Sequence, residues 1–181
     1  MKMGQGRIIS KNEDRVSPWV SLITKEVEFA PGRDTEIYHS FSQSDYISIL
    51  ARTKNGLIPL VRQYRPAVEE YTLELPAGLV DEGEAPIETC RRELMEETGL
   101  VAEEITPLGN FFTDTGRQEN RTHGFLVNSS DPDPDFVPEE GIDVEYVSLD
   151  SLKNNILTNK FRLISHIGIV SMALWRSDFR F

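Results

Sequence analysis

The sequence has little cysteine and no long apolar segment. Among 181 residues Cys90 is the only cysteine, which excludes an intramolecular disulfide and any site built from clustered cysteines. No stretch approaches the roughly 20 apolar residues of a membrane span, and residues 1–16 lack an apolar core of signal-peptide length. We therefore expect a protein of a reducing compartment, the cytoplasm, with no membrane partner.

Positive charge is also scarce. The chain carries 19 Lys and Arg against 30 Asp and Glu, a formal net charge of -11. This balance disfavours broad electrostatic attachment, so we expect no nucleic acid as partner. An acidic protein can still bind a phosphate ester where divalent cations and a few arginines reverse the local field. Seven of the acids fall within residues 78–100, which indicates a local site.

The length and composition fit one well-packed domain with a short extra element. Hydrophobic residues make up 39% of the chain and charged residues 27%, as in ordinary globular proteins. We expect a domain at residues 46–181, preceded by an N-terminal arm and strands at residues 1–45. Residues 1–16 are polar and are predicted to form a loose arm that becomes ordered only on a partner.

Turn residues and alternating runs predict mostly strands. Asn55-Gly56 lies between two apolar runs, which predicts a hairpin with a type I′ turn and strands at residues 46–52 and 57–64. Other β-prone runs lie between turn residues. They are residues 19–29, 38–51, 105–112, 122–128 and 144–149.

Three helices are predicted. The first runs from Ala85 to Thr98, because Pro86 suits a first helical turn and Gly99 suits a C-cap. A short helix is expected at residues 148–157 and an amphipathic one at residues 161–177.

On the first helix, Glu93, Glu96 and Glu97 share an arc of roughly 100°. Cys90 and Leu94 begin an adjoining apolar face, so the carboxylates should stand at the rim of a face that packs on a sheet. Like charges at this spacing repel unless cations are present, and Mg²⁺ prefers oxygen ligands. The alternative is a solvated acidic face with salt bridges inside the helix, the usual role of a charge run.

Arg92 lies four residues before Glu96, where it could hold a glutamate in a ligating rotamer. With its neighbours it belongs to a longer pattern. Residues 78–100 match every fixed position of the Nudix signature, so the chain resembles the Nudix hydrolases. The matching positions are Gly78, Glu84, Arg92, Glu93, Leu94, Glu96, Glu97, Gly99 and Leu100.

The resemblance implies an α/β/α sandwich around a mixed sheet, with added N-terminal antiparallel strands. It also implies Mg²⁺-dependent hydrolysis of the pyrophosphate bond of a nucleoside diphosphate linked to another group, with Mn²⁺ as the alternative ion. Glu93 and Glu97 would be the principal metal ligands and Glu96 a ligand or base. The carbonyl of Ala77 or Gly78 would complete the shell.

Three further acids have roles under the same resemblance. Glu84 would orient Arg92 or bind a water near the substrate, or else act as a capping acid at the helix N-terminus. In some relatives the general base lies on a loop before the last strand, where this chain offers Glu139 and Glu140. We favour Glu140, and the alternative is an acidic surface loop.

The flanking segments resemble the ADP-ribose pyrophosphatase and nucleotide-sugar branch. The matching stretches are Val61 to Arg65 and Leu73 to Gly78. Arg62 and Arg65 are three apart and so point to opposite faces of a strand, and we expect Arg65 to bind a phosphate. The alternative is that both arginines are merely solvated.

The loop after the signature departs from that branch. Residues 113–117 read TDTGR in place of a Ser-Pro-Gly-like turn, which leaves ADP-ribose specificity open. Arg117 is a candidate contact to a sugar or terminal phosphate, although turn formers and solvated charges are the ordinary content of such a loop. Weaker candidates in and beside the loop are Asn120, Arg121 and His123.

The branch also implies a homodimer that exchanges strands at residues 18–45. Trp19, Phe29 and Tyr46 could then contact the nucleobase or the partner, although aromatic residues on strands are more often core. Two other functions stay open at this point. One is a housecleaning hydrolase of nucleoside triphosphates or dinucleotides, and the other is a nucleotide-sensing module without turnover.

Overall fold

The computed structural model describes residues 6–176, which form two compact units. Residues 6–44 and 112–121 belong to the first unit, and residues 45–111 and 122–176 to the second. The loop that follows the signature helix and its strand is therefore part of the N-terminal unit.

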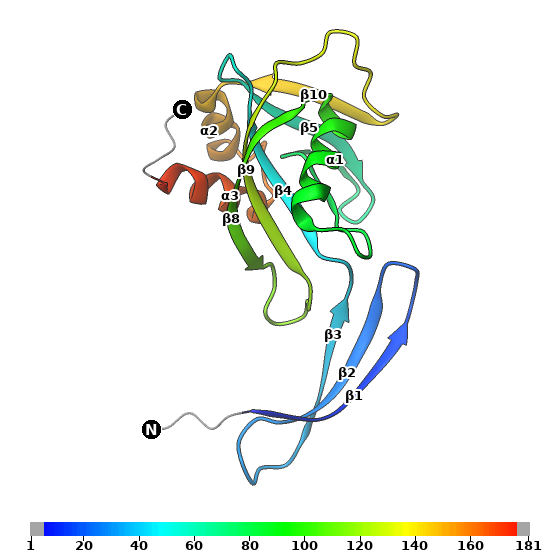
Figure 1. The fold of residues 1–181 in the computed structure, drawn as a ribbon. Helices are drawn as coiled ribbons and strands as arrows, with labels where there is room; N and C mark the ends of the chain where they lie inside the picture. The colour runs from blue at the N-terminus through cyan, green and yellow to red at the C-terminus, as the bar shows by residue number, and fades with distance from the viewer. Residues whose placement is uncertain (1–5, 177–181) are drawn as a thin grey trace. The chain divides into compact units, whose positions relative to one another are not determined.

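The first unit contains a three-stranded antiparallel sheet (Figure 1). Its strands are β1 (Arg7–Arg15), β2 (Ser21–Glu28) and β3 (Glu36–Ser42). The expectation of a loose arm at residues 1–16 is wrong for β1, which pairs with β2 along its length. All nine residues of β1 are exposed, so backbone pairing holds the strand without an apolar pattern that could have predicted it. Residues 1–5 of the expected arm lie outside the described residues.

The second unit is built on a mixed sheet with the strand order β7-β4-β9-β8. In this sheet β4 runs antiparallel to β7 and parallel to β9. A second sheet has the order β10-β5-β6 and is antiparallel. The strands are β4 (Tyr46–Arg52), β5 (Ile58–Arg65), β6 (Glu70–Glu74), β7 (Ala77–Leu79), β8 (Ala102–Phe112), β9 (Arg121–Ser129) and β10 (Ile142–Val147).

The predicted hairpin around Asn55-Gly56 is wrong, because β4 and β5 lie in different sheets. A turn is present, and the Gly56 N–H donates to the Thr53 carbonyl at 2.9 Å. Within this turn only Gly56 has a positive φ, of 77°, whereas a type I′ turn needs two such residues. The turn therefore directs the chain from one sheet to the other.

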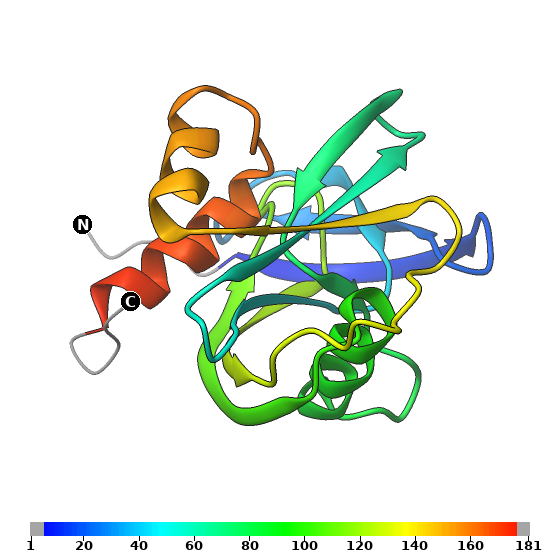
Figure 2. The same cartoon turned by 90° about the horizontal axis from the view of Figure 1, so that it is seen from above.

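Helices cover both faces of β4 (Figures 1 and 2). The helices are α1 (Pro86–Thr98), α2 (Leu149–Leu157) and α3 (Ile164–Trp175). On one face Ile47 and Ile49 of β4 pack with Leu94 of α1, and on the other Leu50 packs with Ile169 of α3. The expected α/β/α sandwich is confirmed. No helix in residues 6–176 is long and apolar enough to cross a membrane.

Candidate active site

Two carboxylates of α1 lie against β7. The helix ends at Gly99, which has a φ of 69° and donates its N–H to Met95, so the predicted C-cap is confirmed. Two residues before Gly99, Glu97 is 8% exposed, and its Oε2 accepts the Ala77 N–H at 3.0 Å. Glu93 lies so close to Gly78 that an added Cβ there would be 2.0 Å from its Oε1. The strand backbone and the two carboxylates thus form one cluster, which we call the carboxylate cluster.

The carboxylate cluster is electrostatically unfavourable by itself. Burial, together with the charge of the nearby Glu93, raises the pKa of Glu97 to about 8, despite the hydrogen bond from Ala77. Burial also raises the pKa of Glu93, although hydrogen bonding to Arg92 opposes this. Desolvation penalises the ionised forms, which a nearby cation would favour.

The donors of the cluster fit a hard divalent ion. The cluster's carboxylates, Glu93 and Glu97, and the carbonyl of Ala77 are all oxygen ligands, the type that Mg²⁺ prefers, and Glu96 beside the cluster is another. Over the part of the chain that the structure describes, no three metal-binding side chains are already grouped around one point. Ligation would therefore require the exposed Glu96 and its neighbours to change rotamer.

Arg92 joins the helix carboxylates to the loop before the helix. Its Nη1 donates to Glu93 at 2.7 Å and to Glu96 at 3.1 Å. Its Nε and Nη2 donate to the two oxygens of Glu84 at 3.2 and 2.9 Å. Hydrogen bonds from Arg92 and then Thr89 lower the pKa of Glu84 to about 2. This geometry fits Glu84 as the residue that orients Arg92, and a substrate contact by Glu84 stays a prediction.

Ala85, rather than Glu84, is the N-cap residue of α1, and this cap has no side-chain hydrogen bond. The capping role considered for Glu84 is therefore not seen. What fixes the start of the helix is Pro86 in its first turn, whose missing N–H needs no partner there.

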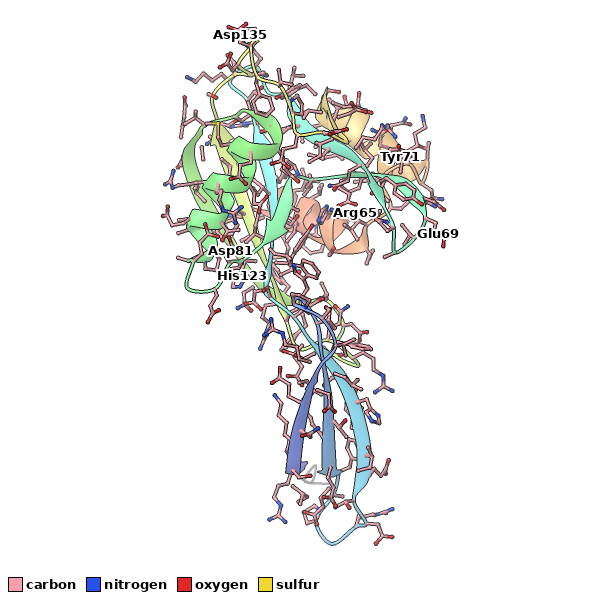
Figure 3. All side chains as sticks on the ribbon, turned by 90° about the vertical axis from the view of Figure 1, so that its right-hand side faces the viewer. Arg65, Glu69, Tyr71, Asp81, His123 and Asp135 are labelled. Atoms are coloured by element: carbon pink, nitrogen blue, oxygen red, sulfur yellow. The ribbon has the colours of Figure 1, made fainter. Side chains whose placement is uncertain are left out.

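Arg65 lies at the end of β5 (Figure 3). Like Arg92, it is oriented by a carboxylate. Its Nε and Nη2 donate to the two oxygens of Glu74 at 2.9 and 2.7 Å. The charge of Arg65 lowers the pKa of Glu97, so the guanidinium lies within electrostatic range of the cluster. Arg62 instead pairs with Glu145 on β10. The two arginines thus have separate partners, as their spacing on the strand predicts.

Sequence reasoning missed a buried polar group close to Arg65 and Glu74. His166 of α3 is fully buried, its Nδ1 accepts the Leu75 N–H at 3.0 Å, and its ring stacks on Tyr46. Burial lowers its pKa to about 4, so the imidazole is neutral at pH 7. The histidine holds the segment that leads into Ala77. A lone histidine on an apolar helix gives no sequence signal for this role.

Glu139 and Glu140 are exposed in the loop before β10. Phe136 of the same loop lies against Gly99, where an added Cβ would be 2.3 Å from the ring. The loop is therefore held at the C-terminal end of α1. The assignment of Glu140 as general base stays a prediction.

The structure divides the candidates of the loop after β8 between the two units. Arg117 belongs to the N-terminal unit, where it donates to the His39 carbonyl at 2.9 Å and stacks over Tyr38 at 4.8 Å. Asn120 and Arg121 belong to the same unit. His123 belongs to the second unit and bonds to Asp45. Substrate binding by Arg117 stays a prediction.

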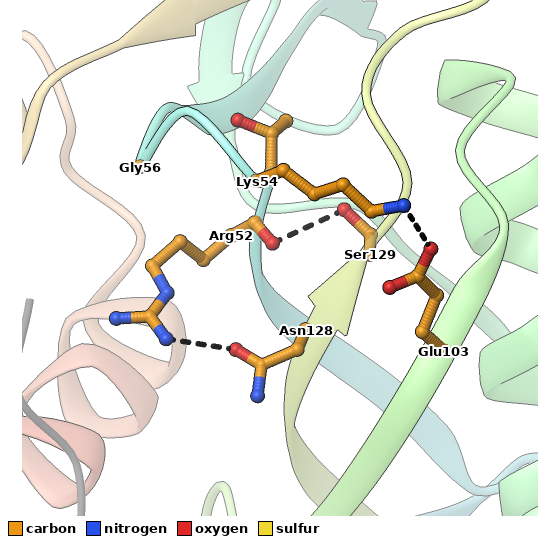
Figure 4. Close-up of a pocket in the computed structure, with 7 residues that line it drawn as sticks. Arg52, Lys54, Gly56, Glu103, Asn128 and Ser129 are labelled. Atoms are coloured by element: carbon orange, nitrogen blue, oxygen red, sulfur yellow. Dashed lines mark hydrogen bonds and ion pairs between the residues drawn. The ribbon is translucent and has the colours of Figure 1, made fainter.

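A cavity of about 380 Å³ lies at the other end of β4 (Figure 4). Arg52 there donates to Asn128 at 3.1 Å, and Lys54 pairs with Glu103 at 2.7 Å. A strand of this length spans roughly 20 Å, so the cavity is separate from the carboxylate cluster near Tyr46.

A model of the NUDIX domain family matches residues 43–166, more than half of the chain. The chain therefore belongs to the Nudix family of pyrophosphohydrolases, and the resemblance seen in the signature is confirmed. Members of this family generally use divalent metal ions and act on small nucleotide substrates.

Relatives with named activities are similar over much of the chain. A Bacillus subtilis protein named ADP-ribose pyrophosphatase is 32% identical over 127 residues, which cover 70% of this chain and 68% of that protein. A Mus musculus protein named ADP-sugar pyrophosphatase is 36% identical over 118 residues, which cover 62% of this chain but only 53% of that protein. The chain thus spans about half the length of the mouse relative.

A solved structure described as an ADP compounds hydrolase has the same fold. The TM-score is 0.78, and the match covers 95% of this chain and 94% of that one at 17% sequence identity. At this identity the likeness supports the architecture alone.

Proposed function

We propose that this Nudix protein hydrolyses the pyrophosphate bond of ADP-ribose or another nucleotide sugar with Mg²⁺, releasing a nucleoside monophosphate and a sugar phosphate. The observation that carries the proposal is the pair of carboxylates, half-buried Glu93 and buried Glu97, against the backbone of β7 and within electrostatic range of Arg65. The names of the relatives from Bacillus subtilis and Mus musculus support the substrate class.

The metal would be held by the carboxylates of Glu93, Glu96 and Glu97 and by the carbonyl of Ala77, with Mn²⁺ as a substitute for Mg²⁺. When bound, such an ion neutralises phosphate charge and lowers the pKa of a water nucleophile. The glutamates would release their protons on binding it, because only carboxylates are effective ligands.

The remaining chemistry belongs to side chains of the chain. Arg92 restricts the rotamers of Glu93 and Glu96 through its two hydrogen bonds. Arg65 would bind a phosphate oxygen through guanidinium donors that Glu74 does not occupy, and Arg117 would bind the sugar or terminal phosphate. The proton of the attacking water would pass to a carboxylate, for which we favour Glu140 over Glu96 and Glu139.

We also propose that the protein is a homodimer that exchanges residues 18–45. The described part of the first unit has no helix to cover its sheet, and large apolar side chains are exposed on it. Those side chains include Ile8, Trp19, Phe29, Ile37 and Phe41. Apolar area of this kind favours burial against another surface.

The dimer can be tested by light scattering on a size-exclusion column. The expected mass is twice the chain mass of 20.6 kDa. Ile37→Glu should shift the protein to monomer, whereas the neighbouring Glu36→Gln should leave the mass unchanged. A wild-type protein that is monomeric at all concentrations would refute the dimer.

The reaction is tested with a substrate panel. The protein is incubated with Mg²⁺ and ADP-ribose, ADP-glucose, GDP-mannose, NADH or diadenosine polyphosphates, and the products are separated by chromatography. Release of a nucleoside monophosphate and a sugar phosphate, absent with EDTA, is expected. Preference for diadenosine polyphosphates would favour a housecleaning hydrolase, and binding without turnover would favour a sensor.

A further inference from the structure

The Arg65–Glu74 ion pair is more buried than the Arg62–Glu145 pair of the same sheet, which has the strand order β10-β5-β6. The Glu74 side chain is only 3% exposed, and that of Arg65 is 35% exposed. Isolating a carboxylate from water is unfavourable unless hydrogen bonds replace the lost solvation. Glu74 obtains them from two donors on one edge of the Arg65 guanidinium, Nε and Nη2, and from the Thr72 hydroxyl at 2.6 Å.

The register of the hairpin explains how this contact forms. Arg65 pairs with Glu70, and Gln63 with Thr72, so the side chains of Arg65, Thr72 and Glu74 lie on one face of β5 and β6. Arg65 reaches back along that face to Glu74. Burial would raise the pKa of Glu74, but hydrogen bonds from Arg65 and Thr72 outweigh it and lower the pKa, so the carboxylate is charged.

Glu74 thereby holds one edge of the Arg65 guanidinium. Glu74 uses Nε and Nη2, which leaves donors of Nη1 for another partner. The same guanidinium is within electrostatic range of Glu97, and it also interacts with the Tyr46 hydroxyl. A phosphate between Arg65 and the carboxylate cluster would therefore meet an arginine whose direction is already set.

We propose that Glu74 is a positioning residue that orients Arg65 toward the diphosphate of the substrate. The inference rests on the proposed function, because it assumes that a diphosphate binds beside Glu93 and Glu97. Preorientation of a binding group reduces the entropy lost when the substrate binds and aligns the charge before the reaction.

A matched control is present on the same strand. Arg62 pairs with Glu145 through the same two residue types, and the acid again lies on a strand adjacent to β5. The side chains of this pair are 41% and 39% exposed. Glu145→Gln therefore repeats the chemical change of Glu74→Gln in a solvated pair that does not belong to the cluster.

The first measurement compares these two variants in hydrolysis of the best nucleotide sugar and in binding of α,β-methylene-ADP with Mg²⁺ by calorimetry. We expect Glu74→Gln to lower kcat/KM and the affinity for the analogue by about 10-fold or more, since a misplaced binding group can cost up to about 100-fold. Glu145→Gln should change both by less than about 2-fold. The Mn²⁺ affinity, read by electron paramagnetic resonance, should be equal in all three proteins.

The second measurement separates positioning from a general structural role. If Glu74 acts through Arg65, Glu74→Gln should cause no further loss in an Arg65→Met background. The double variant removes both charges, which is better tolerated than leaving one buried charge unpaired, so its comparison with Arg65→Met is available even if Glu74→Gln alone unfolds. Glu74→Asp, which keeps the charge but shortens the side chain, should retain an intermediate activity.

The outcomes decide the inference and the proposed function separately. Equal activity of Glu74→Gln and Glu145→Gln, or an undiminished loss in the Arg65→Met background, would overturn the role of Glu74 alone. Wild-type binding of the analogue without turnover of any nucleotide sugar would refute the proposed function, and the affinities would still test Glu74. Absence of both binding and turnover in the wild type would refute both.

Discussion

At the Tyr46 end of β4 the carboxylates of Glu74 and Glu97 are almost completely buried, whereas at the Arg52 end Lys54 and Glu103 pair in contact with solvent. Both are ends of one strand, β4, in the sheet with the order β7-β4-β9-β8. The difference shows that burial of an ionisable group is a local property, which requires particular hydrogen bonds at each site.

Burying ionisable groups lowers the stability of the folded protein. The ion pair at the Arg52 end is exposed, so the strand can end without such burial. At that end the side chains of Lys54 and Glu103 are 59% and 46% exposed, so the pair contributes little. At the Tyr46 end the pKa of Glu97 is raised to about 8 by burial. Strongly perturbed groups of this kind are concentrated at functional sites.

The largest effect should come from removing Glu97. Glu97→Gln is expected to lower kcat/KM at least about 100-fold, because an amide oxygen is a weak substitute for a metal-ligating carboxylate. It should leave the fold intact, since Gln resembles the protonated acid that burial favours at pH 7. Activity and melting temperature are measured together, with Glu88→Gln, an exposed acid of the same helix, as control. Full activity in Glu97→Gln would remove this residue from the ligand set.

A smaller loss is expected from crowding Glu93. Gly78→Ala places a Cβ 2.0 Å from Glu93 Oε1, and the flexible carboxylate must move away. We expect kcat/KM and Mn²⁺ affinity to fall by about 10-fold with little change in melting temperature, since an outer-shell disturbance of this kind costs about 10- to 100-fold. Gly168→Ala in α3, where the structure leaves open space, is the control. Unchanged Mn²⁺ affinity in Gly78→Ala would show that Glu93 does not need its present position.

The contrast between the two ends also explains what the sequence could predict. The spacing of Glu93 and Glu97, with Pro86 and Gly99 at the helix ends, follows local rules, so the helix and its acidic face were predictable. The hydrogen bond from the Ala77 N–H to Glu97 depends on how β7 packs on α1. The resemblance to Nudix hydrolases indicated only that the carbonyl of Ala77 or Gly78 lies near the glutamates.

Long-range pairing was harder to predict than local structure. Asn55-Gly56 has the composition of a hairpin turn, but the strands on either side of it, β4 and β5, pair in different sheets. Tertiary packing therefore overrides the local sequence signal. Likewise β1 lacks a buried face, and the burial of Glu74 and His166 depends on elements far away in sequence. The periodicity of hydrophobic residues and the composition of a segment carry no information about such contacts.

Burial at the Tyr46 end should also give the protein a specific acid sensitivity. The pKa of His166 is lowered to about 4 from an ordinary value of 6.5, so between these values the unfolded chain binds a proton that the folded protein does not. Stability contributed by the neutral imidazole is therefore present above pH 6.5 and is lost as the pH falls toward 4. The loss should reach up to about 3 kcal/mol.

The test is chemical denaturation of His166→Asn at several pH values. Asn has a side-chain oxygen that can accept the Leu75 N–H but does not titrate, so this variant should lose the His166 part of the pH dependence between 6.5 and 4. His39→Asn, which changes an exposed histidine, should keep the wild-type slope. Identical slopes for wild type and His166→Asn would contradict the assignment.

The smallest effect is expected at the Arg52 end of β4. Lys54→Ala removes the pair with Glu103 beside the cavity, but both side chains are exposed, and solvent compensates most of the lost attraction. Melting temperature and kcat/KM should both equal those of the wild type within error, at low salt and at high salt alike. A clear loss of activity in this variant would mean that the cavity is coupled to the carboxylate cluster along β4, and the division of the sheet into a functional end and a solvated end would have to be abandoned.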